Sequence, residues 1–206
     1  MFGAKDAWHA SIVQQQRTKT LKLMSKLVAH APERGRRLIH SRRIQLDGYL
    51  RSDGLLEIEA RLSDTKAVDY AISSGIRKAG EPIHEMEILV VVDARMDVVS
   101  VAAKSQAVPY PGACEEIAPA YASLAGLNLM AGFREAVRSQ LGGIQGCSHL
   151  TELLLAVPTA AVQTFASFFR DNEDAAQKPF PLDRCHALDS RGETVRNYYP
   201  KWYVAD

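Results

Sequence analysis

The stretch I-Q-L-D-G-Y-L-R-S-D-G-L-L-E-I-E-A-R-L, residues 44–62, decides the fold. Apolar residues recur at every second position on both sides of a polar segment: Ile44, Leu46 and Leu50, then Leu56, Ile58, Ala60 and Leu62. This alternation is typical of a strand with one buried face, because successive side chains point to opposite faces of a sheet. Asp53-Gly54 separates the two runs, and glycine tolerates the positive φ of a tight turn. The stretch therefore predicts a β-hairpin.

A second strand pair follows the first. Residues 82–92 are predicted to form a strand, residues 94–97 a turn, and residues 98–103 the returning strand. Four antiparallel strands joined in this order form a β-meander. Such a sheet can leave one face in water while the other is buried, so the rest of the chain is expected to cover one face.

The second half of the chain changes to helical patterns. Residues 114–125, 132–141 and 148–169 each predict a helix, and Pro158 is expected to kink or divide the third. The aromatic tail beyond them is expected to pack back on the body. Strands first and helices later indicate an α+β fold, with about four strands in the meander and three or more helices on one face.

The composition fits one core domain with an added arm. The chain has 206 residues and 47% apolar content, enough for one substantial core, which we expect over residues 34–206. Residues 1–33 are predicted to form a basic, helical arm. The first 43 residues carry a net charge of +8 and the remainder −7. Such an arm contacts phosphates or another anionic surface, docks on its own acidic body, or is a solvated helix, and it could mediate a homo-oligomer.

Several classes of protein are not expected. A membrane helix needs a run of about 18 or more apolar residues, and the chain has none. The first 20 residues lack the apolar stretch of a secretory signal. No motif of sequence-specific nucleic-acid binding occurs. Three cysteines are too few for a disulfide scaffold, so a cytoplasmic protein with free thiols is expected.

A cysteine and a histidine lie two residues apart in G-G-I-Q-G-C-S-H-L-T-E-L-L-L, residues 142–155, where a glycine-rich turn becomes a helix. Unpaired N–H groups of a first helical turn lower the pKa of a thiol. His149 and Glu152 share a helix face, so Cys147, His149 and Glu152 can form one catalytic group. The alternative is structural: Ser148 caps the helix, Cys147 is a small buried residue, and His149 pairs with Glu152.

Other cysteines and histidines extend the candidate site. Cys185-His186 lies in a predicted loop, Cys114 begins a predicted helix, and His84 faces the buried side of a predicted strand. Thiolates and imidazoles suit zinc or iron. The predicted metal ligands are Cys114, Cys147, His149, Cys185 and His186, and the predicted catalytic residues are His84, Cys147, His149 and Glu152. Structural roles remain open for each, since no C-x-x-C or H-E-x-x-H motif is present.

Seven motifs occur in one order along the chain. They are H-S-R-R-I (40–44), D-G-Y-L-R-S-D-G-L-L-E-I-E-A-R-L-S-D-T-K (47–66), G-E-P-I-H-E-M (80–86), P-Y-P-G-A-C-E-E-I-A-P (109–119), L-G-G-I-Q-G-C-S-H-L-T-E-L (141–153), C-H-A-L (185–188) and Y-P-K-W-Y (199–203). Together, over residues 34–203, they resemble a bacterial family of unknown function, the one numbered 2889. That family usually has threonine where Ser148 stands. The resemblance implies that all candidate cysteines and histidines fall within family motifs, and it implies no activity.

Three functional hypotheses follow. The first is a small enzyme whose Cys/His site, with or without zinc or iron, acts on a small organic molecule, carboxylated or aromatic. Arg42 or Arg43 would then bind a substrate carboxylate, because the guanidinium fork matches it. The second is a metal or iron–sulfur scaffold. The third is an interaction domain whose thiols are structural.

Overall fold

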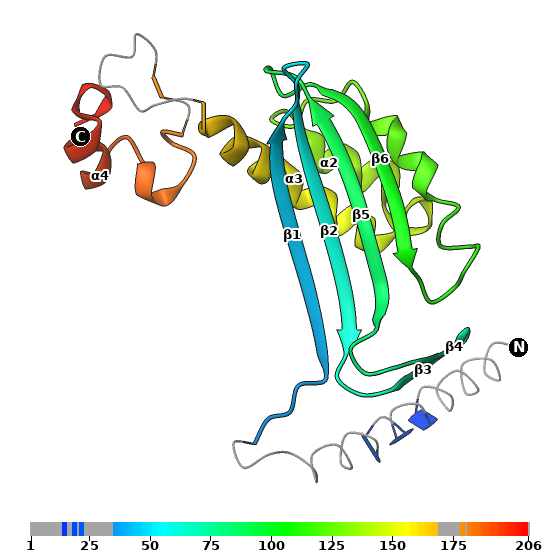
Figure 1. Cartoon of the computed structure of the whole chain (residues 1–206). Helices are drawn as coiled ribbons and strands as arrows, with labels where there is room; N and C mark the ends of the chain where they lie inside the picture. The colour runs from blue at the N-terminus through cyan, green and yellow to red at the C-terminus, as the bar shows by residue number, and fades with distance from the viewer. Residues whose placement is uncertain are drawn as a thin grey trace, which may run out of the picture.

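The computed structural model describes residues 14–15, 18–19, 21–22, 35–168, 178–179 and 181–205. The helix predicted for the basic arm, residues 1–33, therefore lies largely outside the described residues. The continuous part, residues 35–168, consists of a sheet backed by helices, and a small C-terminal segment follows it (Figure 1).

A four-stranded antiparallel sheet forms the centre of the molecule, with the strand order β1-β2-β5-β6 (Figure 1). The strands are β1 (His40–Leu50), β2 (Leu56–Lys66), β5 (Pro82–Val92) and β6 (Val98–Ala107). The predicted meander is confirmed. Three of the strands extend beyond the predicted runs, because backbone pairing continues through polar residues after the apolar alternation has stopped.

A small hairpin interrupts the meander between β2 and β5. It consists of β3 (Tyr70–Ile72) and β4 (Gly75–Arg77), which pair antiparallel. No sequence pattern predicts it, since runs of three residues carry too little alternation to separate a strand from a turn. Arg77 donates a hydrogen bond to the carbonyl of Val108 (3.2 Å), which ties this hairpin to the end of β6.

Helices cover one face of the sheet, as predicted for an α+β fold (Figure 1). Helix α3 (Ser148–Ala166) packs against β1, β2 and β5, and the 3₁₀ helix η1 (Ala118–Leu124) packs against β6. Helix α2 (Phe133–Leu141) packs against α3 and η1, and the short η2 (Gly143–Gln145) joins α2 to α3. No helix in the described part of the chain is long and apolar enough to cross a membrane.

Two helix predictions differ from the structure. The helix predicted over residues 114–125 is a run of turns followed by a 3₁₀ helix, and Pro119, which has no N–H to donate, lies in the first turn of η1. Pro158 does not end α3, which continues through it to Ala166. Pro158 is buried beside the fully buried Val157, so packing against the sheet outweighs the hydrogen bond that proline removes.

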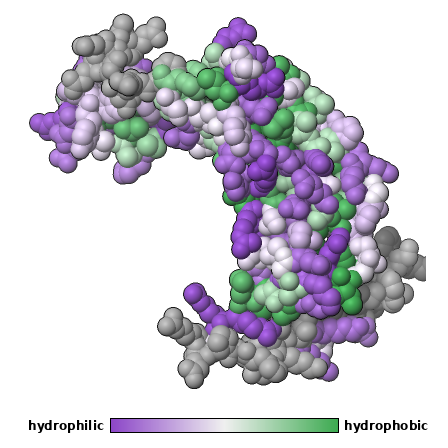
Figure 2. Space-filling view, in the orientation of Figure 1, coloured by the Kyte–Doolittle hydropathy of each residue, from purple (hydrophilic) through white to green (hydrophobic). Residues whose placement is uncertain are grey.

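The core lies between the sheet and the helices. The inward residues of β2 are at most 4% exposed: Leu56, Ile58, Ala60 and Leu62. They meet fully buried residues of α3: Leu150, Leu153, Leu154, Val157 and Ala161. Polar side chains gather over the opposite, open face of the sheet (Figure 2), where Arg61 forms ion pairs with Glu59, Asp47 and Glu87.

The C-terminal segment lies beyond the end of α3, away from the sheet (Figure 1). Its helices are η3 (His186–Leu188), α4 (Glu193–Tyr198) and η4 (Pro200–Trp202), and α4 packs against the other two. Asp183 joins the segment internally, because its carboxylate accepts hydrogen bonds from the backbone N–H (2.7 Å) and the hydroxyl (2.8 Å) of Ser190. The aromatic tail is predicted to pack back on the body, but its described residues pack chiefly on one another.

Gly48 of β1 generates a testable prediction, because α3 crosses β1 closely at this position. A Cβ atom at Gly48 would overlap the hydroxyl of Thr164 and lie 2.7 Å from its Cβ and Cγ2 atoms. We expect Gly48→Ala to lower the free energy of unfolding by about 1–3 kcal/mol, measured by urea denaturation. Adding Thr164→Ala should restore part of the loss, because it removes two of the three overlapping atoms. Equal stability of Gly48→Ala and the wild type would contradict this packing.

Candidate metal centre

Polar residues continue the inward-facing rows of three adjacent strands. Asp64 follows Leu62 by two positions in β2, and His84 precedes Met86 by two positions in β5. Arg42 of β1 is paired with Asp64, and Asp64 is paired with His84. Since side chains alternate along a strand, these three residues extend the core face beyond its apolar part. The sheet therefore ends in a row of charged and imidazole groups that faces α3.

The N-terminus of α3 lies over this row and is fixed by a buried tyrosine. The Tyr121 hydroxyl accepts a hydrogen bond from the backbone N–H of Cys147 (2.9 Å) and lies 3.0 Å from the carbonyl oxygen of the same residue. It also lies 3.1 Å from the hydroxyl of Thr151, which donates to the carbonyl of Leu141. Tyr121 is fully buried. Tyr121 belongs to η1, which packs against β6, so these hydrogen bonds hold the first turn of α3 in place relative to the sheet.

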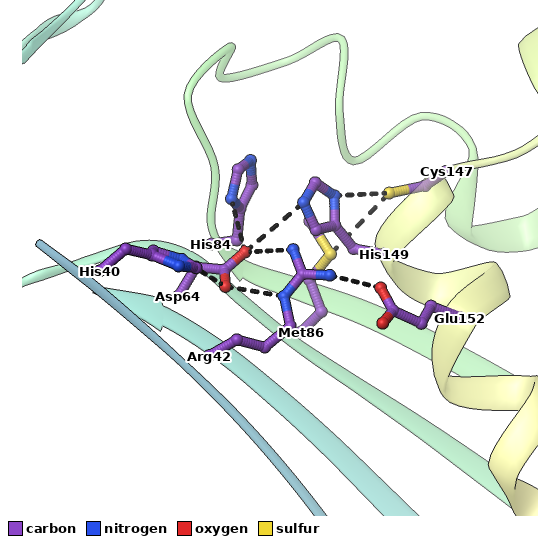
Figure 3. Close-up of polar contacts among 8 residues, drawn as sticks. All are labelled: His40, Arg42, Asp64, His84, Met86, Cys147, His149 and Glu152. Carbon is purple, nitrogen blue, oxygen red and sulfur yellow. Dashed lines mark hydrogen bonds and ion pairs between the residues drawn. The ribbon is translucent and has the colours of Figure 1, made fainter. Parts of the chain in front are cut away.

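Asp64 is the centre of the group (Figure 3). Arg42 donates from Nε to Oδ1 (2.9 Å) and from Nη2 to Oδ2 (2.7 Å), and Nε2 of His40 lies 2.9 Å from Oδ1. Asp64 is only 3% exposed. Burial acts to raise its pKa, but the hydrogen bonds and charges of Arg42 and His40 outweigh burial and lower the pKa to about 2. The carboxylate is therefore ionised at neutral pH.

Two stacked imidazoles face the second oxygen of Asp64. Nδ1 of His84 lies 3.3 Å from Oδ2, and Nε2 of His149 lies 3.6 Å from the same atom. The ring centroids of the two histidines are 3.9 Å apart (Figure 3). Burial, followed by the neighbouring His149, lowers the pKa of His84. A neutral imidazole has a lone pair available for a cation.

The ligand atoms of Asp64, His84 and His149 all lie within 4.8 Å of one another. In a tetrahedral site with metal–ligand distances of about 2.0–2.1 Å, two ligand atoms lie about 3.3–3.4 Å apart. The distances from Oδ2 to the two nitrogens, 3.3 and 3.6 Å, match this spacing. Among the residues that the structure describes, this is the one group of three or more such side chains that can hold a metal ion.

Cys147 lies on the side of His149 that faces away from Asp64. Its Sγ lies 3.7 Å from Nδ1 of His149, the ring nitrogen that does not face Asp64, and 3.9 Å from Sδ of Met86. Burial acts to raise the thiol pKa, but the imidazole of His149 and the backbone N–H groups of Leu150 and His149 outweigh it and lower the pKa. Cys147 is also the N-cap residue of α3, in place of the Ser148 cap of the structural alternative. The thiol is thus placed to orient His149.

The structure brings five of the predicted site residues together around Asp64: Arg42, His84, Cys147, His149 and Glu152. Glu152 accepts a hydrogen bond from Nη1 of Arg42. Cys147 is not among the ligand atoms that cluster, so its predicted role as a ligand is not the one that this geometry favours.

Four other predicted residues lie apart from the centre. Arg43 follows Arg42 in β1 and so points to the open face of the sheet. Cys114 packs at the edge of the hydrophobic core. Cys185 and His186 are exposed in the C-terminal segment, beyond a helix of 19 residues that is about 28 Å long. A loop position gave no information on where the tertiary fold would carry them.

Asp64 and His40 complete the centre and are absent from the predicted set. A sequence signal for Asp64 existed, because the alternation Leu56, Ile58, Ala60, Leu62 continues to residue 64. A polar residue directly after an apolar run is also typical of a strand end, so the pattern does not distinguish the two roles. His40 lies two residues before Arg42 on the same face, and this parity would have identified it.

The pKa of Asp64 generates a prediction on stability. Because the pKa in the folded chain is about 2, below the ordinary 3.8, Asp64 stabilises the fold above pH 4 and loses that contribution as the pH falls toward 2. The contribution amounts to about 2 kcal/mol at neutral pH. We expect Asp64→Asn to flatten this part of the curve of unfolding free energy against pH, measured by urea denaturation. An unchanged slope in the variant would show that Asp64 does not carry it.

The comparisons with known proteins agree with the resemblance seen in the sequence. Residues 40–163, more than half of the chain, match the family described as protein of unknown function (DUF2889). The match contains all eight residues of Figure 3, whereas the C-H-A-L and Y-P-K-W-Y motifs lie outside it. No curated protein and no solved structure gives a significant match. The chain belongs to the DUF2889 family.

Proposed function

We propose that this chain is a metal-dependent enzyme in which Asp64, His84 and His149 hold one zinc or iron ion and act on a small organic molecule. The observation that carries the proposal is the cluster of three ligand atoms from β2, β5 and α3 within 4.8 Å. The two imidazole side chains are 19% and 20% exposed, so a substrate can approach them.

The number of protein ligands favours catalysis over a structural metal. Structural zinc sites are closed by four protein ligands, whereas catalytic sites use three and keep a position open. Two histidines and one carboxylate are also a ligand set of iron(II) enzymes. When bound, such an ion supplies a Lewis acid and an acidified water.

The surrounding residues have roles that need no further group. Arg42 and His40 keep Asp64 ionised and fix its orientation. If Nε2 of His149 faces an ion, Nδ1 carries the proton and can donate it to the thiol of Cys147. The thiol can in turn donate to Sδ of Met86, 3.9 Å away. These two hydrogen bonds fix the tautomer of His149. Metal-binding histidines generally donate their other ring N–H to such a partner.

A second candidate function has its own observation. The Cys147 thiol lies 3.7 Å from His149, and its pKa is lowered, as expected of a nucleophile paired with a base. In that case His149 would be the general base that takes the proton from the Cys147 thiol, and no metal would be needed. An iron–sulfur scaffold is less well supported, because no cysteine among the described residues belongs to a group of three metal-ligand side chains.

Metal binding tests the proposal directly. The protein purified without an affinity tag or chelator should contain about one zinc or iron per chain by elemental analysis. We expect His84→Ala, His149→Ala and Asp64→Asn each to abolish stoichiometric zinc binding in calorimetric titrations. Cys185→Ala and His186→Ala, which alter ligands predicted from sequence but exposed in the tail, should bind zinc as the wild type does. Zinc binding that survives in both His84→Ala and His149→Ala would exclude this centre.

Cys147 separates the two candidate functions. If it orients His149, Cys147→Ala should weaken zinc binding about 10–100-fold without abolishing it, as loss of a second-layer partner does. If it is a nucleophile, the thiol should react rapidly with iodoacetamide at neutral pH, and zinc should not slow the reaction. Full zinc affinity in Cys147→Ala, together with rapid alkylation, would favour the nucleophile.

A further inference from the structure

We propose that the substrate carries a carboxylate that replaces Glu152 on Arg42, so that the enzyme acts on small carboxylates. The substrate would also contact the metal ion through a second group, and that part of the inference rests on the metal centre proposed above. Glu152 would then serve as an internal stand-in for the substrate, and it would leave the guanidinium when the substrate binds.

Arg42 divides its guanidinium between two carboxylates of different accessibility (Figure 3). Nε and Nη2 donate to Asp64, whose side chain is 5% exposed. Nη1 donates to Glu152, whose side chain is 46% exposed. One carboxylate is therefore part of the buried centre, and the other lies at its rim.

The rim contact is the exchangeable one. An exposed ion pair contributes only about 0–1 kcal/mol, so the bond between Arg42 and Glu152 is easily broken. The Glu152 side chain is 46% exposed and can rotate into water. Asp64 cannot, because removing the guanidinium would leave a buried charge without a partner. The Arg42 side chain is 33% exposed, so a solute can reach Nη1.

Charge favours an anion at this position. Arg42, Asp64 and Glu152 together carry one net negative charge, and a bound divalent cation would make the group net positive. A substrate carboxylate that displaces Glu152 keeps the hydrogen bond to Nη1 and brings a charge that the cation attracts. A neutral molecule would gain neither, and Glu152 would stay in place.

The position of Asp64 sets the size of the substrate. Its Oδ2 accepts a hydrogen bond from Nη2 of Arg42 (2.7 Å) and lies 3.3 and 3.6 Å from the two imidazole nitrogens. The anion site on Arg42 and the metal ligands therefore flank the same carboxylate. A molecule of a few heavy atoms can reach both, with its carboxylate on Arg42 and a neighbouring hydroxyl, carbonyl or amine on the ion.

The test uses glycolate and its neutral analogue glycolamide as probes, titrated by calorimetry into the zinc-loaded full-length chain. Glu152→Gln should bind glycolate about fivefold more tightly than the wild type, because the competing ion pair is gone. It should bind glycolamide equally. On the zinc-free protein, Arg42→Lys should lose about tenfold or more of the glycolate affinity, since lysine cannot contact two carboxylates with a fork. Glu135→Gln, which removes an exposed carboxylate from α2, is the matched control and should change nothing.

The outcomes distinguish this inference from the proposed function. If zinc binds but glycolate affinity is the same in Glu152→Gln and the wild type, or glycolamide gains equally, the exchange on Arg42 is wrong while the metal centre stands. The same titrations on zinc-free protein test Arg42 by itself. If zinc-free Glu152→Gln binds glycolate more tightly than the zinc-free wild type, the replacement of Glu152 by a carboxylate is supported even if zinc does not bind. Equal glycolate affinity of these two zinc-free proteins overturns it.

Discussion

A carboxylate removed from water needs positive or donating partners, and in this chain the burial of Asp64 imposes that need on everything around it. Arg42, His40, His84 and His149 come from β1, β5 and α3, and all approach one side chain of β2. Removing the partners would leave an uncompensated buried charge, which costs several kcal/mol. The polar end of the sheet and the start of α3 are therefore coupled through a single residue.

That coupling explains why the site lies where the core stops. Inward positions of β2 and β5 are apolar where α3 covers them and become polar at Asp64 in β2 and at His84 in β5. The helix begins there, and its first turn contributes Cys147 and His149 while its middle packs on the apolar rows. Three neighbouring strands, β1, β2 and β5, thus contribute site residues at paired positions at one end of the sheet. The sheet on one side and α3 on the other limit how far these residues can move.

Much of this arrangement could be predicted from local patterns. The alternation in residues 44–62 identified the hairpin, and the turn-to-helix boundary at Cys147 identified the three residues that α3 contributes to the centre: Cys147, His149 and Glu152. Arg42 shares the parity of Ile44, but both arginines lie before the first residue of the predicted strand, so the alternation alone did not separate Arg42 from Arg43. Asp64 was obscured because a polar residue after an apolar run resembles a strand end. The positions of Cys114, Cys185 and His186 depend on tertiary contacts that no spacing encodes.

Folding stability and metal binding favour different hydrogen bonding of Asp64, and its two carboxylate oxygens differ in the same way. Folding favours a carboxylate whose lone pairs are all paired, whereas a metal ligand needs one left free. Oδ1 accepts from both Nε of Arg42 and His40, while Oδ2 accepts one short bond, from Nη2 of Arg42. A carboxylate oxygen can accept two hydrogen bonds, so Oδ2 retains capacity on the side where the imidazoles lie. Lysine in place of Arg42 could not bind both oxygens in a fixed plane, and the orientation that leaves Oδ2 toward His84 and His149 would be lost.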